Sequence, residues 1–451
     1  MRVPRVVVGG TSSGVGKTTV ATGLAAALAG RGLKVAAFKV GPDFIDPSYH
    51  ALATGRPPRN LDAFMQGPDL IAPLFAHGAA GADVAVVEGV MGLFDGASSH
   101  GELASTAQVA KLLDAPVLLV VDASAMARSV AAMVHGYATF DPGVRLAGVV
   151  CNKVGSPRHA EILREALEPS IPLLGAIPRH HELRAPSRHL GLVPVAERPA
   201  EARRAVADLG GHIAATLDLD GVLTLARRAP TLHCAAWAPA RRARPDRHKV
   251  GIAVAGGPAF SFCYTENLEL LTAAGADLLP LDPTRDEALP EGTQALYLGG
   301  GFPEAHAEAL SANAPLRRAV RAFAGPVLAE CGGLLYLCET LDGLPMCGVV
   351  GANATMTDRL NLGYREAEAA TASALWDQGE RTRGHEFHYS TVSPGAGPAP
   401  AWHLNRPEGF VIDRVHASYL HTHWAATPHI ARRLVEAAGA RSATPIPEGS
   451  S

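Results

Sequence analysis

Short apolar runs alternate with segments of helical pattern through the first half of the chain. Continuous apolar strands separated by helices are typical of a parallel sheet that is covered on both faces. The strands are predicted at residues 6–9, 35–39, 84–88, 117–121 and 146–151. The helices are predicted at residues 17–29, 105–113, 125–138 and 158–167. This half is therefore predicted to be a parallel α/β domain.

A second α/β unit begins at the apolar run Val250-Gly-Ile-Ala-Val-Ala255. Further strands are predicted near Leu296 and Val327, with helices at residues 266–274, 304–310 and 332–339. The segment between the two halves is rich in Arg, Pro and Ala, which favours an interdomain linker over an ordinary surface loop. The predicted boundaries are a first domain at residues 1–225, a linker at 226–248, a second domain at 249–440 and a mobile tail at 441–451.

The composition of the 451 residues narrows the class of protein: 47% are hydrophobic, 18% are charged and the formal net charge is -3. This balance suits a globular protein with large cores and gives no basic field for nucleic acid. No apolar run is long enough to span a bilayer, and the first residues do not resemble a cleavable signal peptide. The six cysteines lack metal-site spacing and are expected to be reduced thiols. We therefore expect a cytoplasmic protein without nucleic-acid or membrane partners, and the sequence leaves open whether it forms a homodimer.

A phosphate-binding loop follows the first predicted strand and opens the first predicted helix. The sequence is Gly10-Thr-Ser-Ser-Gly-Val-Gly-Lys-Thr-Thr19. Its glycines let backbone N–H groups point into one concavity, and the helix N-terminus adds partial positive charge. Lys17 is expected to reach the β- and γ-phosphates of ATP, and the Thr18 hydroxyl to bind Mg²⁺. The expected nucleotide-binding residues here are Thr11, Ser12, Ser13, Gly14, Val15, Gly16, Lys17, Thr18 and Thr19.

Acidic residues follow two other predicted strands and should lie at the same sheet edge as the loop. Glu88 ends the strand at 84–88 and leads into a glycine-rich loop, while Asp43 and Asp46 follow the strand that ends at Lys39. Carboxylates in these places can bind Mg²⁺ directly or through water. The predicted metal ligands are therefore Thr18, Asp43, Asp46 and Glu88. Lys39, together with Asp46, is expected at a phosphate or a substrate carboxylate. A solvated loop acid and an ordinary turn are the alternatives.

Two further segments carry weaker signals. Asn152 closes the fifth predicted strand, where its side chain could hydrogen-bond the nucleotide base or cap a turn. Arg188 and His189 lie in a basic stretch that could pair with substrate carboxylates, although a solvated polar loop would have the same composition.

The second domain contains a cysteine at a strand-to-helix turn, in Leu328-Ala-Glu-Cys331-Gly-Gly-Leu-Leu335. Small residues around a sharp turn indicate a nucleophile elbow, and the following helix is expected to lower the pKa of the Cys331 thiol. The N–H of Gly332 and a second N–H from Gly300 or Gly301 are the predicted oxyanion donors. A buried structural cysteine is the alternative for Cys331 taken alone.

A histidine-rich segment near the C-terminus supplies the base that the thiol needs. His421 is the predicted general base, and His423 is two residues further on, where it could orient His421. Another cluster, His385-Glu-Phe-His388, differs from the His-Glu-x-x-His metal spacing, and its alternation suits a strand rather than a metal site.

These motifs together resemble the cobyrinic acid and hydrogenobyrinic acid a,c-diamide synthases of cobalamin biosynthesis. The residues that carry the resemblance extend over nearly the whole chain: 10–19, 38–46, 88–96, 188–192, 297–304, 330–333, 383–388 and 418–423. The resemblance implies an N-terminal P-loop domain like that of dethiobiotin synthetase. It also implies a C-terminal domain of the triad-type class I glutamine amidotransferases. Many class I members have His-x-Glu where this chain has His421-Thr-His423, so the third triad member is left open.

The resemblance implies ATP- and glutamine-dependent amidation of the a- and c-carboxylates of a corrin-ring acid, with ATP and Mg²⁺ as cofactors. Hydrogenobyrinic acid is the favoured acceptor, while cob(II)yrinic acid and nickel sirohydrochlorin are alternatives. An enzyme of cobyric acid synthesis is a further alternative that the whole-chain motifs disfavour. A partitioning-type switch ATPase is a different class of function. Such proteins usually carry an additional lysine early in the loop, where this chain has Thr11 and Ser12.

Overall fold

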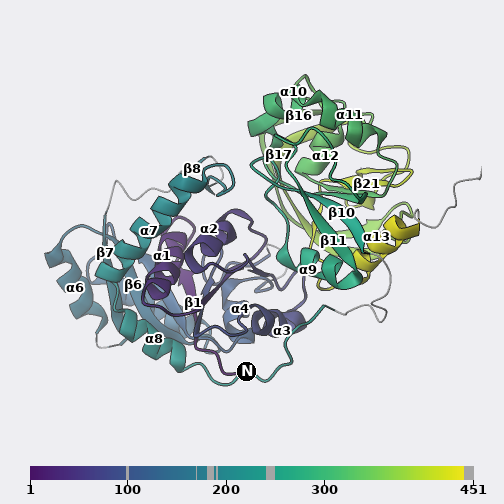
Figure 1. Cartoon of the computed structure of the whole chain (residues 1–451). Helices are drawn as coiled ribbons and strands as arrows, with labels where there is room; N and C mark the ends of the chain where they lie inside the picture. Colours follow the sequence, from purple (N-terminus) through teal and green to yellow (C-terminus); the bar gives the residue numbers. More distant parts are fainter. Residues whose placement is uncertain (98–100, 169, 180–186, 189–190, 240–248, 441–451) are drawn as a thin grey trace, which may run out of the picture. The chain divides into compact units, whose positions relative to one another are not determined.

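The computed structural model describes residues 1–97, 101–168, 170–179, 187–188, 191–239 and 249–440, and the chain forms two compact units, residues 1–238 and 239–451 (Figure 1). Helix α8 ends at Arg227 and the first unit extends to Ala238, so the start of the segment expected as a linker belongs to that unit. The rest of the linker prediction, 240–248, and the predicted mobile tail, 441–451, lie outside the described residues.

A parallel sheet of seven strands forms the centre of the first unit, in the order β3-β2-β4-β1-β5-β6-β7. The strands are β1 (Arg5–Gly10), β2 (Val35–Val40), β3 (Asn60–Leu61), β4 (Val84–Glu88), β5 (Val117–Asp122), β6 (Leu146–Val154) and β7 (Leu173–Pro178). Every residue of β1, β2 and β4 is buried, which explains why these strands are apolar except for Arg5, Lys39 and Glu88 at or next to their ends. The predicted parallel sheet is confirmed, with each of the five predicted strands within a few residues of its expected place, while β3 and β7 were not predicted.

Helices cover this sheet, and one of them is itself covered by another. The helices are α1 (Lys17–Gly30), α2 (Ile45–Thr54), α3 (Pro68–Gly78), α4 (Thr106–Leu112), α5 (Ser129–Phe140), α6 (Pro157–Leu167), α7 (Pro199–Thr216) and α8 (Leu219–Arg227). In Figure 1, α1 and α7 lie side by side. Glycines allow this close approach, because a Cβ at Gly23 would lie 2.4 Å from Ile213 Cγ1. Two short strands, β8 (Ser187–Arg188) and β9 (Gly191–Leu192), pair antiparallel in the same unit.

The second unit contains two sheets. The first has the order β11-β10-β12-β13-β21-β20 and is parallel except for its last pair. Its strands are β10 (Val250–Ala255), β11 (Ala276–Leu281), β12 (Thr293–Leu298), β13 (Val327–Glu330), β20 (Phe410–Ile412) and β21 (Val415–Ser418). Its helices are α9 (Thr265–Ala274), η1 (Pro303–His306), α10 (Ala307–Ala312), α11 (Ala314–Ala322), α12 (Gly332–Leu337) and α13 (His429–Gly439). The predicted α/β fold of this domain is confirmed.

The second sheet of this unit was not predicted. A long antiparallel hairpin forms most of it, and its strand β22 carries the histidine predicted as the base. Its strands are β14 (Thr340–Leu341), β15 (Leu344–Pro345), β16 (Asn353–Ala369), β17 (Arg381–Ser393), β18 (Trp402–His403), β19 (Pro407–Glu408) and β22 (His421–Thr422). Much of β16 is exposed, so its sequence lacks a continuous apolar run. In the described part of the chain, no helix is long and apolar enough to cross a membrane.

Candidate active sites

The phosphate loop has the backbone geometry that its glycines permit. Gly14 and Gly16 have positive φ angles of 77° and 101°, in the region that favours glycine. A Cβ on Gly16 would lie only 2.2 Å from Asn152 Nδ2, so this position also requires glycine for space. Lys17 Nζ donates to the Ser12 carbonyl at 2.9 Å. The loop thus curls around the Lys17 side chain, as expected for a phosphate cradle.

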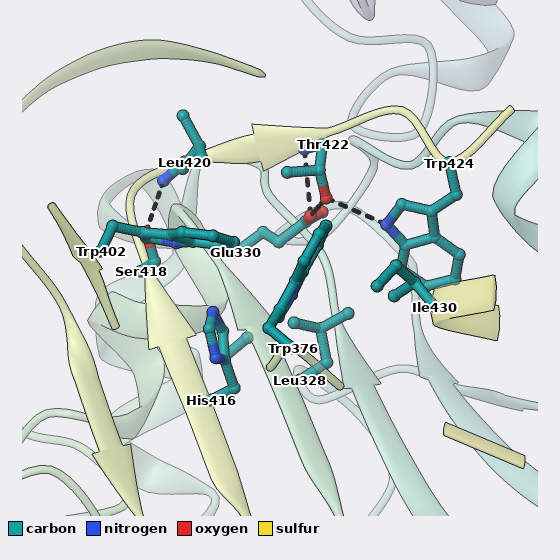
Figure 2. Close-up of a pocket in the computed structure, with 11 residues that line it drawn as sticks. Leu328, Glu330, Trp376, Trp402, His416, Ser418, Leu420, Thr422, Trp424 and Ile430 are labelled. Carbon is teal, nitrogen blue, oxygen red and sulfur yellow. Dashed lines mark hydrogen bonds between the residues drawn. The ribbon is translucent and has the colours of Figure 1, made fainter. Parts of the chain in front are cut away.

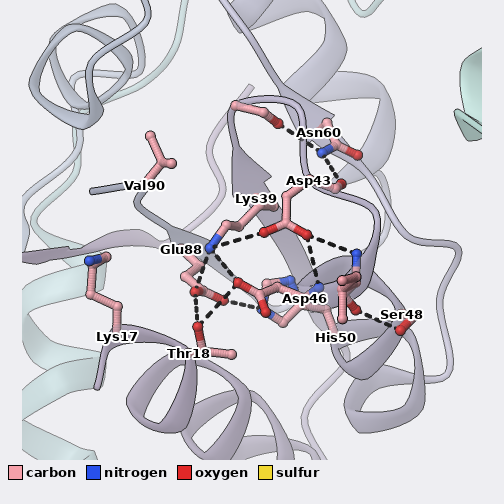
Figure 3. A network of polar contacts seen from close by, with 12 residues as sticks. Lys17, Thr18, Lys39, Asp43, Asp46, Ser48, His50, Asn60, Glu88 and Val90 are labelled. Atoms are coloured by element: carbon pink, nitrogen blue, oxygen red, sulfur yellow. Dashed lines mark hydrogen bonds and ion pairs between the residues drawn. The ribbon is translucent and has the colours of Figure 1, made fainter. Parts of the chain in front are cut away.

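A buried network of charged groups lies beside Thr18, where β2, β4 and α2 meet (Figure 3). The Thr18 hydroxyl donates at 2.6 Å to Glu88 Oε1 and lies 3.1 Å from Asp46 Oδ2. Lys39 Nζ lies 2.6 Å from both carboxylates and 3.8 Å from Asp43 Oδ2. The structure therefore brings together the residues that the sequence predicted for this edge.

The charges in this network shift one another's pKa values. Burial alone would raise the pKa of Glu88, but Lys39 and His50 outweigh it and hold this pKa far below its usual range. Burial, followed by repulsion from Asp43, raises the pKa of Asp46. The carboxylates raise the pKa of Lys39 despite its burial, so the ammonium stays charged. The ionised Glu88 and the charged Lys39 therefore offset each other inside the cluster.

The oxygen groups of this cluster fit Mg²⁺. Hard divalent cations prefer oxygen ligands, and the Thr18 hydroxyl lies within hydrogen-bond distance of one oxygen of Asp46 and one of Glu88. Over the described residues, no three His, Cys, Asp or Glu side chains form a metal site on their own. A Mg²⁺ site that is completed by nucleotide phosphates needs fewer protein ligands. The oxygen groups around Thr18 are therefore compatible with the absence of such a three-residue site in the described part of the chain. The assignment of Asp43 and the other three residues as ligands stays a prediction.

Three other predicted residues of this unit have different outcomes. Asn152 is buried and donates from Nδ2 to the Val15 carbonyl at 2.9 Å, so its observed partner is the loop backbone and base binding stays a prediction. Arg188 ends strand β8, and its side chain is not described. His189 lies outside the described residues.

Cys331 occupies a sharp turn between β13 and α12. Its φ of 50° and ψ of −102° are rarely adopted by residues other than glycine, which is typical of a nucleophile elbow. Its N–H donates to the Ser418 carbonyl at 2.8 Å, and its thiol lies 3.9 Å from the Phe387 carbonyl. Burial, reinforced by Glu304, raises the pKa of this thiol. The expected lowering of this pKa by the helix is therefore wrong, because burial outweighs the Gly332 N–H.

The glycines that follow β12 have different roles around the Cys331 turn. The N–H of Gly300 donates to the Phe262 carbonyl at 3.0 Å, so its prediction as an oxyanion donor is wrong in this structure. Gly300 is needed for space instead, since a Cβ there would lie 2.3 Å from His421 Cε1. The Gly301 nitrogen lies 3.0 Å from the position that a Cβ would take on Gly332, so these two backbone segments approach closely. Gly301 and Gly332 stay predicted oxyanion donors.

The predicted base His421 is buried in β22 and stacks on His385 of β17. These residues are paired in register, and their ring centroids are 4.7 Å apart with an interplanar angle of 9°. Burial, followed by repulsion from His388, lowers the pKa of His421 to about 3, which keeps the imidazole neutral and able to accept a proton. His423 lies 3.4 Å from Glu266 of α9. Its observed partner is that carboxylate, and a role in orienting His421 stays a prediction.

Comparison with known proteins supports the same pair of domains. Residues 6–193 match the CobQ/CobB/MinD/ParA nucleotide binding domain, and residues 251–429 match the CobB/CobQ-like glutamine amidotransferase domain. A hydrogenobyrinate a,c-diamide synthase of Streptomyces coelicolor is 57% identical, covering 96% of this chain and 97% of that protein. The Thermobifida fusca enzyme of this name is 50% identical, with 96% and 97% covered. A cobyrinate a,c-diamide synthase of Syntrophotalea carbinolica is 45% identical, with 97% and 99% covered.

The chain belongs to the hydrogenobyrinate a,c-diamide synthase family. This confirms the resemblance and the two-domain fold predicted from the sequence. The match to diamide synthases extends through both units, so it covers the phosphate loop and the Cys331 turn in one alignment.

Sequence reasoning missed two residues in this member of the diamide synthase family. His50 Nε2 lies 2.7 Å from Glu88 Oε2 and holds the second oxygen of that carboxylate. It follows Asp46 by four residues on α2, a spacing that places both on one helix face and could have revealed it. His385 was placed on a strand by its alternation, but only the register of β17 with β22 shows that it lies against His421.

Nucleotide binding by this diamide synthase family member should weaken at alkaline pH. Burial, followed by repulsion from Lys39, lowers the pKa of Lys17 to about 8 in the ligand-free chain. Phosphates require the protonated amine, so above this pKa binding must take up a proton. The Kd for ATP should rise towards tenfold per pH unit for one linked proton. Calorimetric titration from neutral pH to about pH 10 would measure this slope. A Lys17→Arg chain stays charged over this range, so its Kd should lose this dependence on pH. An unchanged slope in that variant would show that the linked proton binds to a group other than Lys17.

Proposed function

We propose that this chain converts hydrogenobyrinic acid to its a,c-diamide, using ATP and glutamine. The carrying observation is the presence, in one chain, of a phosphate loop joined to the buried Thr18–Glu88 network and of a strained Cys331 turn in the same unit as a buried neutral histidine, His421. The first arrangement suits phosphoryl transfer and the second suits glutamine hydrolysis. Relatives named hydrogenobyrinate a,c-diamide synthase share 50–57% of their residues with it over nearly their whole length.

In the synthetase unit, the chemical obstacle is the poor leaving group of a carboxylate. Transfer of the γ-phosphoryl group of ATP to a substrate carboxylate gives an acyl phosphate, which ammonia can attack with loss of phosphate. Lys17 would hold the phosphates, and the charged Lys39 would offset negative charge during transfer. Mg²⁺, when held by Thr18, Asp46 and Glu88, supplies positive charge at the phosphate oxygens.

In the glutaminase unit, His421 would take the proton of the Cys331 thiol as the sulfur attacks the glutamine side-chain carbonyl. Burial raises the pKa of this thiol and lowers that of His421, so the proton would move only as the sulfur attacks the carbonyl and not before. The N–H groups of Gly301 and Gly332 would stabilise the oxyanion. Ammonia leaves with a proton returned from His421, and water then releases glutamate from the thioester.

The test is product formation by the full-length chain with ATP, Mg²⁺ and glutamine. Hydrogenobyrinic acid and cobyrinic acid would be supplied separately and the products identified by mass spectrometry. We expect two carboxylates of hydrogenobyrinic acid to become amides, with one ADP and one glutamate formed for each. A higher kcat/KM for cobyrinic acid would transfer the proposal to that acceptor. Absence of amidation with both acids would overturn it.

A further inference from the structure

Glu330, the residue before Cys331, accepts three hydrogen bonds inside the protein. Its Oε1 accepts from Thr422 N at 3.1 Å and from Thr422 Oγ1 at 2.8 Å, while Oε2 accepts from Tyr297 OH at 3.0 Å. Figure 2 shows Thr422 between this carboxylate and Trp424, whose indole N–H donates to Thr422 Oγ1 at 2.9 Å. The carboxylate is 4% exposed, so water does not compete for these donors.

Asn267 of α9 closes these bonds into a ring. It donates to the Thr422 carbonyl at 3.0 Å, accepts from Trp424 N at 2.9 Å and lies 3.3 Å from Tyr297 OH. Two members of this ring, Asn267 and Tyr297, are fully buried. Buried polar networks that are fully hydrogen-bonded hold a single geometry, because each displaced partner would leave an unsatisfied group.

The ring connects the neighbours of the two reacting side chains. Glu330 precedes the nucleophile Cys331, and Thr422 follows the base His421. The Thr422 N–H belongs to the peptide group that joins it to His421. Its hydrogen bond therefore holds the backbone that aims the imidazole. One edge of β22 is paired with β17, where His421 lies opposite His385. Glu330 therefore holds the edge of β22 that this pairing does not occupy.

We propose that Glu330 is a positioning residue for the glutaminase step and that its bonds to Thr422 set the separation of Cys331 from His421. This inference rests on the proposed function, since it assumes that these two residues hydrolyse glutamine. A carboxylate suits the task because it accepts from all three donors at once. An amide in its place has one accepting oxygen, and its NH₂ must face either Thr422 or the Tyr297 hydroxyl.

The experiment measures glutamine hydrolysis and ammonia-driven amidation in full-length chains. Glu330→Gln keeps the side-chain shape, and Thr422→Val removes the hydroxyl from the opposite end. Small displacements of reacting groups cost up to about 100-fold in rate. We expect each variant to lower kcat for glutamine hydrolysis by about 10–100-fold, with KM for glutamine and ammonia-driven amidation within about twofold of the unsubstituted chain. The double variant should be little worse than either single variant, because both break the same contact.

Glu408 provides the matched control. It is similarly buried in the same unit, and its hydrogen bonds come from Ser418 Oγ at 2.6 Å and Tyr419 N at 2.9 Å instead of from Thr422. Glu408→Gln should lower the melting temperature about as much as Glu330→Gln but leave kcat within about threefold. Equal kcat losses in these two variants, or an unchanged kcat in Glu330→Gln, would overturn the inference. An unsubstituted chain without glutaminase activity would instead overturn the proposed function.

Discussion

Replacing Cys331 with alanine is expected to lower glutamine-driven amidation by at least about 10³-fold while leaving ammonia-driven amidation near its original rate. The reason is a division of chemistry between the units. In the proposed mechanism, Cys331 releases nitrogen from glutamine, whereas the phosphate loop and the Thr18–Glu88 pair activate the acceptor. Assays at alkaline pH, where ammonium salts supply free ammonia, would measure both rates in one preparation.

Cys338 offers the control for this substitution. It is a second buried free cysteine in the same core cluster, but it has ordinary backbone geometry and follows α12. Cys338→Ala removes a similar volume and should cost about 1 kcal/mol in stability, with both amidation rates within about twofold of the unsubstituted chain. If Cys331→Ala reduced ammonia-driven amidation as strongly as glutamine-driven amidation, the proposed division of labour would be wrong.

The parts of this fold that depend on local sequence could be predicted. The phosphate loop needs only a strand, its glycines and a helix, so its place between β1 and α1 followed from residues 10–19. Glu88 could be placed near Thr18 because parallel strands end at one sheet edge. The cover of α1 by α7 was not predicted, although α1 is apolar on nearly all sides. Periodicity alone does not say which distant helix packs there.

The parts of the glutaminase site that depend on pairing between distant strands could not be predicted. The sequence indicates that Gly300 lies in a glycine-rich turn, but not that its N–H is paired with Phe262. In the same way, alternation placed His385 on a strand without giving its partner. One residue of register would turn its side chain to the other face and away from His421. Burial of Cys331 was considered only as the alternative to catalysis, and it reverses the direction of the pKa shift that the helix suggested.

Glu88→Gln should remove the function of the other unit. Both oxygens of Glu88 are occupied, by Thr18 and Lys39 on one side and by His50 on the other. An uncharged amide would present NH₂ to one of these donors and remove the negative charge that offsets Lys39, weakening the fit of the cluster to Mg²⁺ and the aim of Thr18. We expect amidation to fall at least about 100-fold with glutamine and with ammonia alike. Steady-state assays with each nitrogen donor would measure both losses.

Stability measurements distinguish this loss from unfolding. Removing one partner of a buried ion pair costs roughly 3–5 kcal/mol, and Glu88→Gln should cost less because Lys39 keeps Asp46. The same substitution at Glu161, whose pair with Arg158 is largely exposed on α6, should change neither stability nor amidation measurably. Urea unfolding would provide the stability comparison. Full ammonia-driven amidation by a folded Glu88→Gln chain would exclude Glu88 from the synthetase site, because Thr18 and Lys39 would then act without their shared partner.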